Sequence, residues 1–177
     1  MKLNSLLFWI VFVSWCFVLY GAASSNFDSK PSYLEDTLKD APVEAHKLLD
    51  VAEKHLGTPY HFGGKSPKGF DCSGFTYYCY QQQGIQIPRS SKQQINAGIE
   101  IPYKHARKGD LIVFTGTNIK KREPGHVGIV VSNTSEGLTF IHSSSSKKTN
   151  GIVYNTIPAN KESFYQKRFL QIRRVFK

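Results

Sequence analysis

The spacing of apolar residues changes character part-way along this chain of 177 residues. Between residue 44 and about residue 98, the sequence predicts helices, joined by the Gly- and Pro-rich loop GTPYHFGGKSPKG. The first predicted helix has apolar residues at three- and four-residue spacing, at Ala45, Leu48, Leu49, Ala52 and Leu56, and is ended by Gly57. The segments DCSGFTYYCYQQQG and SSKQQINAG predict a second helix, closed by Gly84, and a short third one.

The second half of the chain has the pattern of β-strands. Five short runs rich in β-branched and aromatic residues are separated by turn residues: DLIVF, HVGIVV, GLTFIH, GIVYNTI and RFLQIRRVF. Helices followed by strands indicate the α+β class. We therefore expect N-terminal helices packed on an antiparallel sheet of about five to six strands.

The N-terminus has the pattern of an export signal. Lys2 precedes an apolar run from Leu6 to Tyr20, and GAAS supplies small residues for cleavage. The run is shorter than the ~20 residues of a membrane span. We predict a signal peptide at 1–23, a polar linker at 24–43 and one folded domain at 44–177. The protein is then exported to the cell envelope or secreted. An uncleaved membrane anchor, or a lipoprotein linked through Cys16, is the alternative.

The charge balance favours anionic partners. The formal net charge of the chain is +10, and a basic exported protein is expected to associate with anionic polymers. The basic C-terminus, KRFLQIRRVFK, is a candidate nucleic-acid patch. However, Leu170, Ile172 and Phe176 are evenly spaced there, which favours a half-buried strand with its charges outside. We expect no nucleic-acid partner and a monomeric protein.

Two cysteines remain after the predicted cleavage, Cys72 and Cys79. On one helix they lie roughly 10 Å apart, beyond the ~7 Å limit between the Cα atoms of a disulfide. Scattered histidines disfavour a metal, and we expect no cofactor. Cys79 lies among tyrosines and is interpreted as a packing residue. Cys72 follows a Gly-rich loop and begins the second helix, where the helix N-terminus is expected to lower the pKa of its thiol. Cys72 is therefore the candidate nucleophile.

A cysteine nucleophile needs a base, and the chain has six histidines: His46, His55, His61, His105, His126 and His142. His46 and His55 are expected at the surface of the first helix. His126 begins one predicted strand, and His142 ends the next. A hairpin turning around residues 133–137, with Gly128 opposite His142, makes the two histidines diagonal neighbours on one face, ~7–8 Å apart. We predict Cys72 as nucleophile, His126 as base and His142 as the residue that orients it.

Five ordered blocks carry a resemblance to a known family: GTPYHFGGKSPKGFDCSGF, IPRSSKQQ, KGDLIVF, GHVGIVV and FIHSSSS. Their order and spacing resemble those of the NlpC/p60 family of papain-like cysteine peptidases over roughly residues 46–176. The resemblance implies a papain-like fold and hydrolysis of amide bonds in peptidoglycan stem peptides. It matches Cys72, His126 and His142 to the family's catalytic positions.

The resemblance also implies roles around the nucleophile. Tyr60 matches a tyrosine near the thiolate and the oxyanion, Asp71 a residue that recognises a substrate amine, and the backbone N–H of Cys72 or Ser73 an oxyanion donor. Phe62 departs from the Trp common in relatives. The basic insertion TNIKKREPG offers Lys120, Lys121 and Arg122 as contacts to substrate carboxylates.

These observations predict an exported cysteine endopeptidase. The bond is the γ-D-glutamyl-diaminopimelate linkage or the cross-link between stems. Two alternatives stay open: a non-catalytic module that binds stem peptides, and a thiol amidase, transpeptidase or acyltransferase acting on another substrate.

Overall fold

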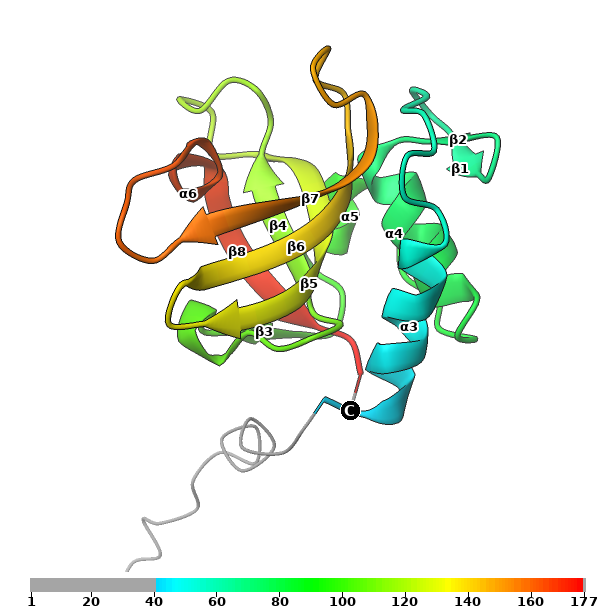
Figure 1. Cartoon of the computed structure of the whole chain (residues 1–177), viewed down its shortest axis with the longest axis horizontal. Helices are drawn as coiled ribbons and strands as arrows, with labels where there is room; N and C mark the ends of the chain where they lie inside the picture. Colours follow the sequence, from blue (N-terminus) through cyan, green and yellow to red (C-terminus); the bar gives the residue numbers. More distant parts are fainter. Residues whose placement is uncertain (1–40, 177) are drawn as a thin grey trace, which may run out of the picture. The chain divides into compact units, whose positions relative to one another are not determined.

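The computed structural model describes residues 41–176 of the chain (Figure 1). The predicted signal peptide, Cys16 and all of the predicted linker except its last three residues lie outside this range. Within the described range, no helix is both long and apolar enough to cross a membrane.

The three predicted helices are present and lie at the start of the described range. Helix α3 (Val43–Glu53) buries Ala45, Leu48, Leu49 and Ala52. It ends before Leu56, which is exposed in the following turn. Helix α4 (Cys72–Gln81) is preceded by Asp71, whose side chain accepts a hydrogen bond from the backbone N–H of Gly74. Helix α5 (Ser91–Gln94) is a single turn.

Six antiparallel strands form the main sheet, in the order β3-β8-β4-β5-β6-β7. Their bounds are β3 Ile99–Ile101, β4 Leu111–Thr115, β5 Pro124–Thr134, β6 Gly137–Ser144, β7 Gly151–Pro158 and β8 Phe169–Arg174. The five predicted runs correspond to β4 through β8, and β3 is the additional strand. The expected α+β architecture is therefore confirmed.

Short elements complete the described fold. The strands β1 (Lys65–Ser66) and β2 (Gly69–Phe70) form a small hairpin before α4. A 3-10 turn, η1 (Tyr103–His105), follows β3, and helix α6 (Phe164–Arg168) directly precedes β8.

The core lies between the two helices α3 and α4 and one face of the sheet (Figure 1). It includes Leu48 from α3, Phe75 and Cys79 from α4, and Val127, Ile129 and Ile141 from the sheet. Full burial of such a Leu, Ile, Val or Phe side chain contributes roughly 1.5–3 kcal/mol. This packing fixes the N-terminus of α4 against β5, and that position is where the predicted site is assembled.

The C-terminal strand lies inside the sheet, between β3 and β4, and not all of its charges face outward as expected. Arg174 is 3% exposed. Its Nε donates to Asp110 Oδ1 and its Nη2 to Asp110 Oδ2, both at 2.9 Å. The carboxylate compensates the buried guanidinium, which explains how a charge is tolerated at this position.

Candidate active site

The loop before α4 approaches the helix so closely that glycine is required. The backbone N–H of Asp71 donates to the Gly64 carbonyl at 3.0 Å. A Cβ atom at Gly74, in the first turn of α4, would collide with that same carbonyl oxygen. Residues 64 and 74 therefore bring the loop onto the helix N-terminus and fix the backbone around Cys72.

Asp71 and Arg89 hold this loop together. Asp71 Oδ1 accepts from the Gly74 N–H at 2.6 Å and from Arg89 Nη1 at 3.0 Å, while Oδ2 accepts from Arg89 Nη2 at 2.8 Å. Arg89 Nη2 also donates to the carbonyls of Gly63 and Gly64. Both carboxylate oxygens of Asp71 are thus engaged within the protein.

Ser73 is buried beside this ion pair. Its hydroxyl donates to Asp71 Oδ1 at 3.3 Å and accepts from Arg89 Nη1 at 3.1 Å. Its carbonyl accepts from Gln94 Nε2 at 3.0 Å, and Gln94 is fully buried. Gln94 therefore links the single turn of α5 to the first turn of α4.

Cys72 is the first residue of α4 and is half-buried as a free thiol. The backbone N–H groups of Ser73, Val127 and Cys72 itself form hydrogen bonds that favour its thiolate. Burial, together with the negative charge of Asp71, nevertheless raises the pKa of the Cys72 thiol. The expectation that the helix N-terminus lowers this pKa is therefore wrong, because desolvation outweighs the backbone N–H groups.

His126 and His142 form a hydrogen-bonded pair across β5 and β6. His126 Nε2 lies 2.9 Å from His142 Nδ1, and the two rings are nearly perpendicular. Ile129 pairs with Ile141, which is the register that sets Gly128 opposite His142. The predicted diagonal contact between the two imidazoles is confirmed.

Both imidazoles are held in their neutral form. Burial, followed by the charges of His142 and Arg168, lowers the pKa of His126 well below its ordinary value. Burial lowers the pKa of His142 to about 4, although its bond to Asn155 opposes this. Together with the raised pKa of Cys72, these shifts favour a neutral thiol and neutral imidazoles.

An aromatic and cationic wall from α6 covers the histidines. Tyr165 Oη lies 3.4 Å from His142 Nε2, and the Tyr165 ring packs on Phe114 and Phe140. Arg168 is 6% exposed, and its Nη2 donates to the Thr115 carbonyl at 2.7 Å. Its guanidinium lies 4.7 Å from the centre of the Phe164 ring. The wall therefore adds a buried positive charge near the two imidazoles.

Tyr60 lies close enough to Cys72 for their charges to interact. It forms an isolated bridge with Phe70, just before Cys72 in the chain. Burial, followed by the charges of Cys72 and Asp71, raises the pKa of the Tyr60 hydroxyl. The structure thus brings Tyr60, Asp71 and Ser73 together around Cys72.

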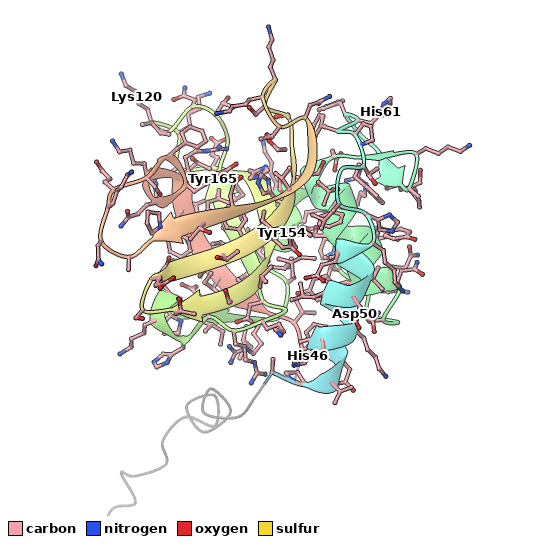
Figure 2. The ribbon with its side chains drawn as sticks, in the orientation of Figure 1. His46, Asp50, His61, Lys120, Tyr154 and Tyr165 are labelled. Carbon is pink, nitrogen blue, oxygen red and sulfur yellow. The ribbon has the colours of Figure 1, made fainter. Side chains whose placement is uncertain are left out.

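The other predicted positions lie at the rim or outside the site. Phe62 is 88% exposed. Lys120 and Lys121 are exposed on the β4–β5 loop, and Figure 2 shows Lys120 and His61 at opposite sides of this end of the molecule. Arg122 instead donates to the carbonyls of Lys167 and Phe169, which fastens the loop to α6 and β8.

Two further sequence expectations concern histidines and metals. His46 is exposed as expected, but His55 is half-buried, with its ring against Phe70 and Tyr78. Across residues 41–176, no group of three or more His, Cys, Asp or Glu side chains is arranged to hold a metal ion.

A family model described as NlpC/P60 family matches residues 57–174. The match includes Tyr60, Cys72, His126 and His142. The chain belongs to the NlpC/P60 family. Among curated NlpC/P60 relatives, the murein DD-endopeptidase MepS/murein LD-carboxypeptidase of Escherichia coli is 28% identical, over 88% of this chain and 75% of that protein. The γ-DL-glutamyl hydrolase of Bacillus subtilis is 37% identical, over 76% of this chain but only 29% of that protein.

Solved NlpC/P60 structures agree with the fold. A family protein from Bacillus cereus has a TM-score of 0.62 and 34% identity, over 74% of this chain and 40% of that one. RipD of Mycobacterium tuberculosis, described as a non-catalytic NlpC/p60 domain protein adapted to peptidoglycan binding, has a TM-score of 0.58 and 20% identity. At that identity the likeness concerns the fold alone. Because an NlpC/P60 domain can be non-catalytic, family membership does not show catalysis, and the case for catalysis depends on the site.

Sequence reasoning missed four side chains of this NlpC/P60 site: Arg89, Gln94, Asn155 and Arg168. Arg89 and Gln94 belong to the block IPRSSKQQ, one of the five that carry the family resemblance. Their position in that block could have marked them as candidate site residues. Asn155 lies 2.8 Å from His142 Nε2 through its Oδ1, yet it stands in an ordinary strand pattern. Arg168 belongs to the basic C-terminal segment. The contacts of Asn155 and Arg168 depend on sheet order, which the sequence pattern does not reveal.

Proposed function

We propose that this NlpC/P60 protein is a cysteine endopeptidase that hydrolyses an amide bond in peptidoglycan stem peptides. The observation that carries the proposal is the hydrogen-bonded His126–His142 pair, together with a free thiol at the N-terminus of α4 that receives a backbone hydrogen bond from Val127, the residue after His126. Cys72 is the proposed nucleophile, His126 the base and His142 the orienting residue. A purely structural cysteine needs no such pair of neutral imidazoles.

The proposed reaction proceeds through a thioester. His126 removes the proton from the Cys72 thiol as sulfur bonds to the substrate carbonyl carbon, and the imidazolium gives that proton to the leaving amine as the C–N bond breaks. Water then attacks the thioester, His126 accepts the proton of the water, and the proton returns to the departing sulfur. His142 holds His126 in orientation through both steps.

Charge on the carbonyl oxygen needs donors during both steps. The backbone N–H of Cys72 or Ser73 and the hydroxyl of Tyr60 are proposed for this role, and each donor of this kind is worth ~2.7–4 kcal/mol in other hydrolases. Asp71 is proposed to receive a substrate amine at the edge of its ion pair with Arg89. Arg89 already donates to both carboxylate oxygens of Asp71. The substrate amine would therefore donate to the second lone pair of one of these oxygens.

The names of two relatives support the proposed substrate class. One is named for murein endopeptidase and carboxypeptidase activity, and another for hydrolysis of γ-glutamyl bonds. The candidate bonds are therefore the stem-to-stem cross-link and the γ-D-glutamyl-diaminopimelate linkage. Export through residues 1–23 would bring the domain to this substrate.

Digestion of purified peptidoglycan by the whole chain tests the proposal. We expect soluble fragments whose masses identify one of the two bonds, and no fragments from the Cys72→Ala variant. Cys79→Ala is the matched control and should retain activity. Binding to peptidoglycan without release of fragments would instead establish the non-catalytic module, and release of an amide or a transferred acyl group would establish the other thiol chemistry.

A further inference from the structure

Three polar side chains on three neighbouring strands are connected in a line of hydrogen bonds that includes the proposed base. His126 on β5, His142 on β6 and Asn155 on β7 are joined by contacts of 2.9 and 2.8 Å. In the register of β6 with β7, His142 lies opposite Val153, so Asn155 is displaced diagonally by two residues. In the register of β5 with β6, His126 is displaced by two residues in the opposite direction along β6. The sheet thus aligns the three side chains end to end.

In each contact of this line, the neighbouring group determines whether the ring nitrogen carries a proton. Asn155 presents its carbonyl oxygen Oδ1 to His142 Nε2, so that nitrogen carries a proton and donates. A neutral His142 then has a lone pair on Nδ1, which accepts from His126 Nε2. His126 consequently has its remaining lone pair on Nδ1, the ring nitrogen that can serve as the proposed base for Cys72. The opposite amide orientation would reverse every bond and leave Cys72 without a base.

The surroundings favour neutral imidazoles in this line. His142 is fully buried, and the Tyr165 hydroxyl also approaches its Nε2. The guanidinium of Arg168 packs over the Phe164 and Tyr165 rings on the same side. No acidic side chain in the described part of the chain forms an ion pair with Arg168. A neutral amide at position 155 fixes the direction of the hydrogen bonds without adding a negative charge that would attract a second proton to His142.

We propose that Asn155 is a positioning residue: its side-chain carbonyl sets the tautomers of His142 and His126 and thereby leaves His126 Nδ1 unprotonated toward Cys72. The inference rests on the proposed role of His126 as the base. Asn155 touches neither the nucleophile nor the substrate, and acts through two imidazoles.

Nitrogen NMR of the histidine rings in the whole chain at pH 8 tests this without any need for turnover. In the parent, we expect both His126 and His142 to carry their proton on Nε2. In Asn155→Leu, which keeps the approximate size and removes the acceptor, we expect His142 to populate both tautomers. Asn155→Asp restores an acceptor at the same place and should restore the single tautomer at this pH.

Kinetics on peptidoglycan fragments provide the second readout. Asn155→Leu should lower kcat about ten- to a hundredfold, part of the ~10²–10⁴-fold that a positioned base contributes, with KM little changed. At pH 8, where His142 stays neutral, Asn155→Asp should recover most of that loss. Thr156→Val, next to Asn155 on β7, is the matched control: it removes the 2.9 Å contact of Thr156 with Thr139 on β6 and should leave kcat unchanged.

Three results would overturn the inference: a proton on Nδ1 of His126 in the parent, a single Nε2–H tautomer that persists in Asn155→Leu, or an Asn155→Asp variant as impaired as Asn155→Leu. A parent with the expected tautomers but no activity on peptidoglycan would instead refute the proposed function and leave the proton order standing.

Discussion

At the scale of single residues, the site combines a thiol that resists ionisation with imidazoles that resist protonation. Desolvation raises the pKa of Cys72 and lowers the pKa values of His126 and His142. Arg168 contributes to both histidine shifts, because a nearby positive charge disfavours an imidazolium. These directions favour neutral resting groups, so in the proposed reaction the proton moves to His126 as sulfur attacks.

A neutral resting pair has a characteristic pH dependence. The lowered pKa of His126 keeps it available as a base below pH 6.5, the ordinary value for histidine. The raised pKa of Cys72 keeps the thiol protonated above its ordinary range. We expect kcat/KM to show a broad plateau, with an acid limb below pH 6.5. The measurement is the profile of kcat/KM against pH. An acid limb above pH 6.5 would contradict a neutral thiol and imidazole at rest.

Burial of neutral His142 also links stability to pH. Its folded-state pKa of about 4 lies below the unfolded value of 6.5, so the unfolded state binds more protons between these values. The contribution of neutral His142 to the free energy of unfolding is present above pH 6.5 and falls as the pH is lowered toward 4. We expect a loss of about 2 kcal/mol from this residue between pH 7 and pH 5, measured by urea unfolding.

The variant His142→Gln should reduce this slope, whereas His46→Gln, an exposed change on α3, should not. An unchanged slope in His142→Gln would show that other groups dominate the acid sensitivity.

At the scale of elements, the N-terminus of α4 is fixed from three directions. The loop carrying Gly64 lies against Gly74, Arg89 ties that loop to Asp71, and Gln94 joins α5 to the Ser73 carbonyl. In addition, the backbone N–H of Val127 on β5 forms a hydrogen bond with the thiol. A small displacement of the N-terminus of α4 would therefore move Cys72 relative to β5.

Replacing Gly74 by Ala tests this close approach. The added Cβ would collide with the Gly64 backbone, which is unable to move like a flexible side chain. We expect a destabilisation of about 1–3 kcal/mol, typical of overpacking. We also expect kcat to fall by a larger factor than KM changes. In the control Gly116→Ala, the Cβ meets only an ordinary contact at 3.9 Å. Equal unfolding free energies and equal kcat for the two variants would contradict the account.

The element pattern and the catalytic candidates were predictable from the sequence, because they depend on local spacing. The helix N-terminus at Cys72 follows from a Gly-rich loop and a capping residue, and the contact of His126 with His142 follows from strand alternation and one hairpin. Asn155 and Arg168 were not predictable, since β7 and the α6–β8 segment reach the site only through sheet order. The pKa of Cys72 was wrongly predicted because helix geometry is visible in a sequence, whereas desolvation depends on tertiary packing.

At the scale of the whole molecule, three loops gather at the end of the sheet that presents the site (Figure 1). The β4–β5 loop precedes His126, and the β6–β7 loop follows His142. The Gly-rich loop is held at the start of β7, because the N–H of Ile152 donates to the Thr58 carbonyl and the N–H of Gly57 donates to the Ile152 carbonyl. Their exposed side chains form a cationic rim, which consists of Lys65, Lys68, Lys120, Lys121, Lys147 and Lys148. Such a rim is suited to attract the carboxylates of peptidoglycan stems.

The cationic rim predicts a salt-dependent contribution to substrate capture. Neutralising Lys120 and Lys121 to Gln should lower kcat/KM on peptidoglycan at low salt, and the difference should shrink as salt screens the charges. The control variant carries Lys47→Gln and Lys54→Gln, two exposed changes around α3 that remove the same charge away from the rim. If both double variants lost activity equally, general charge and not the rim would be responsible.

The central claim is that Cys72 forms a thioester with the acyl part of a peptidoglycan stem. Rapid acid quenching of the whole chain during turnover, followed by mass analysis of its peptides, measures this directly. We predict an added mass equal to the acyl fragment on the peptide that contains Cys72, present in Cys79→Ala and absent in Cys72→Ala. Continued release of peptidoglycan fragments by the Cys72→Ala variant at the parent's rate would contradict the claim.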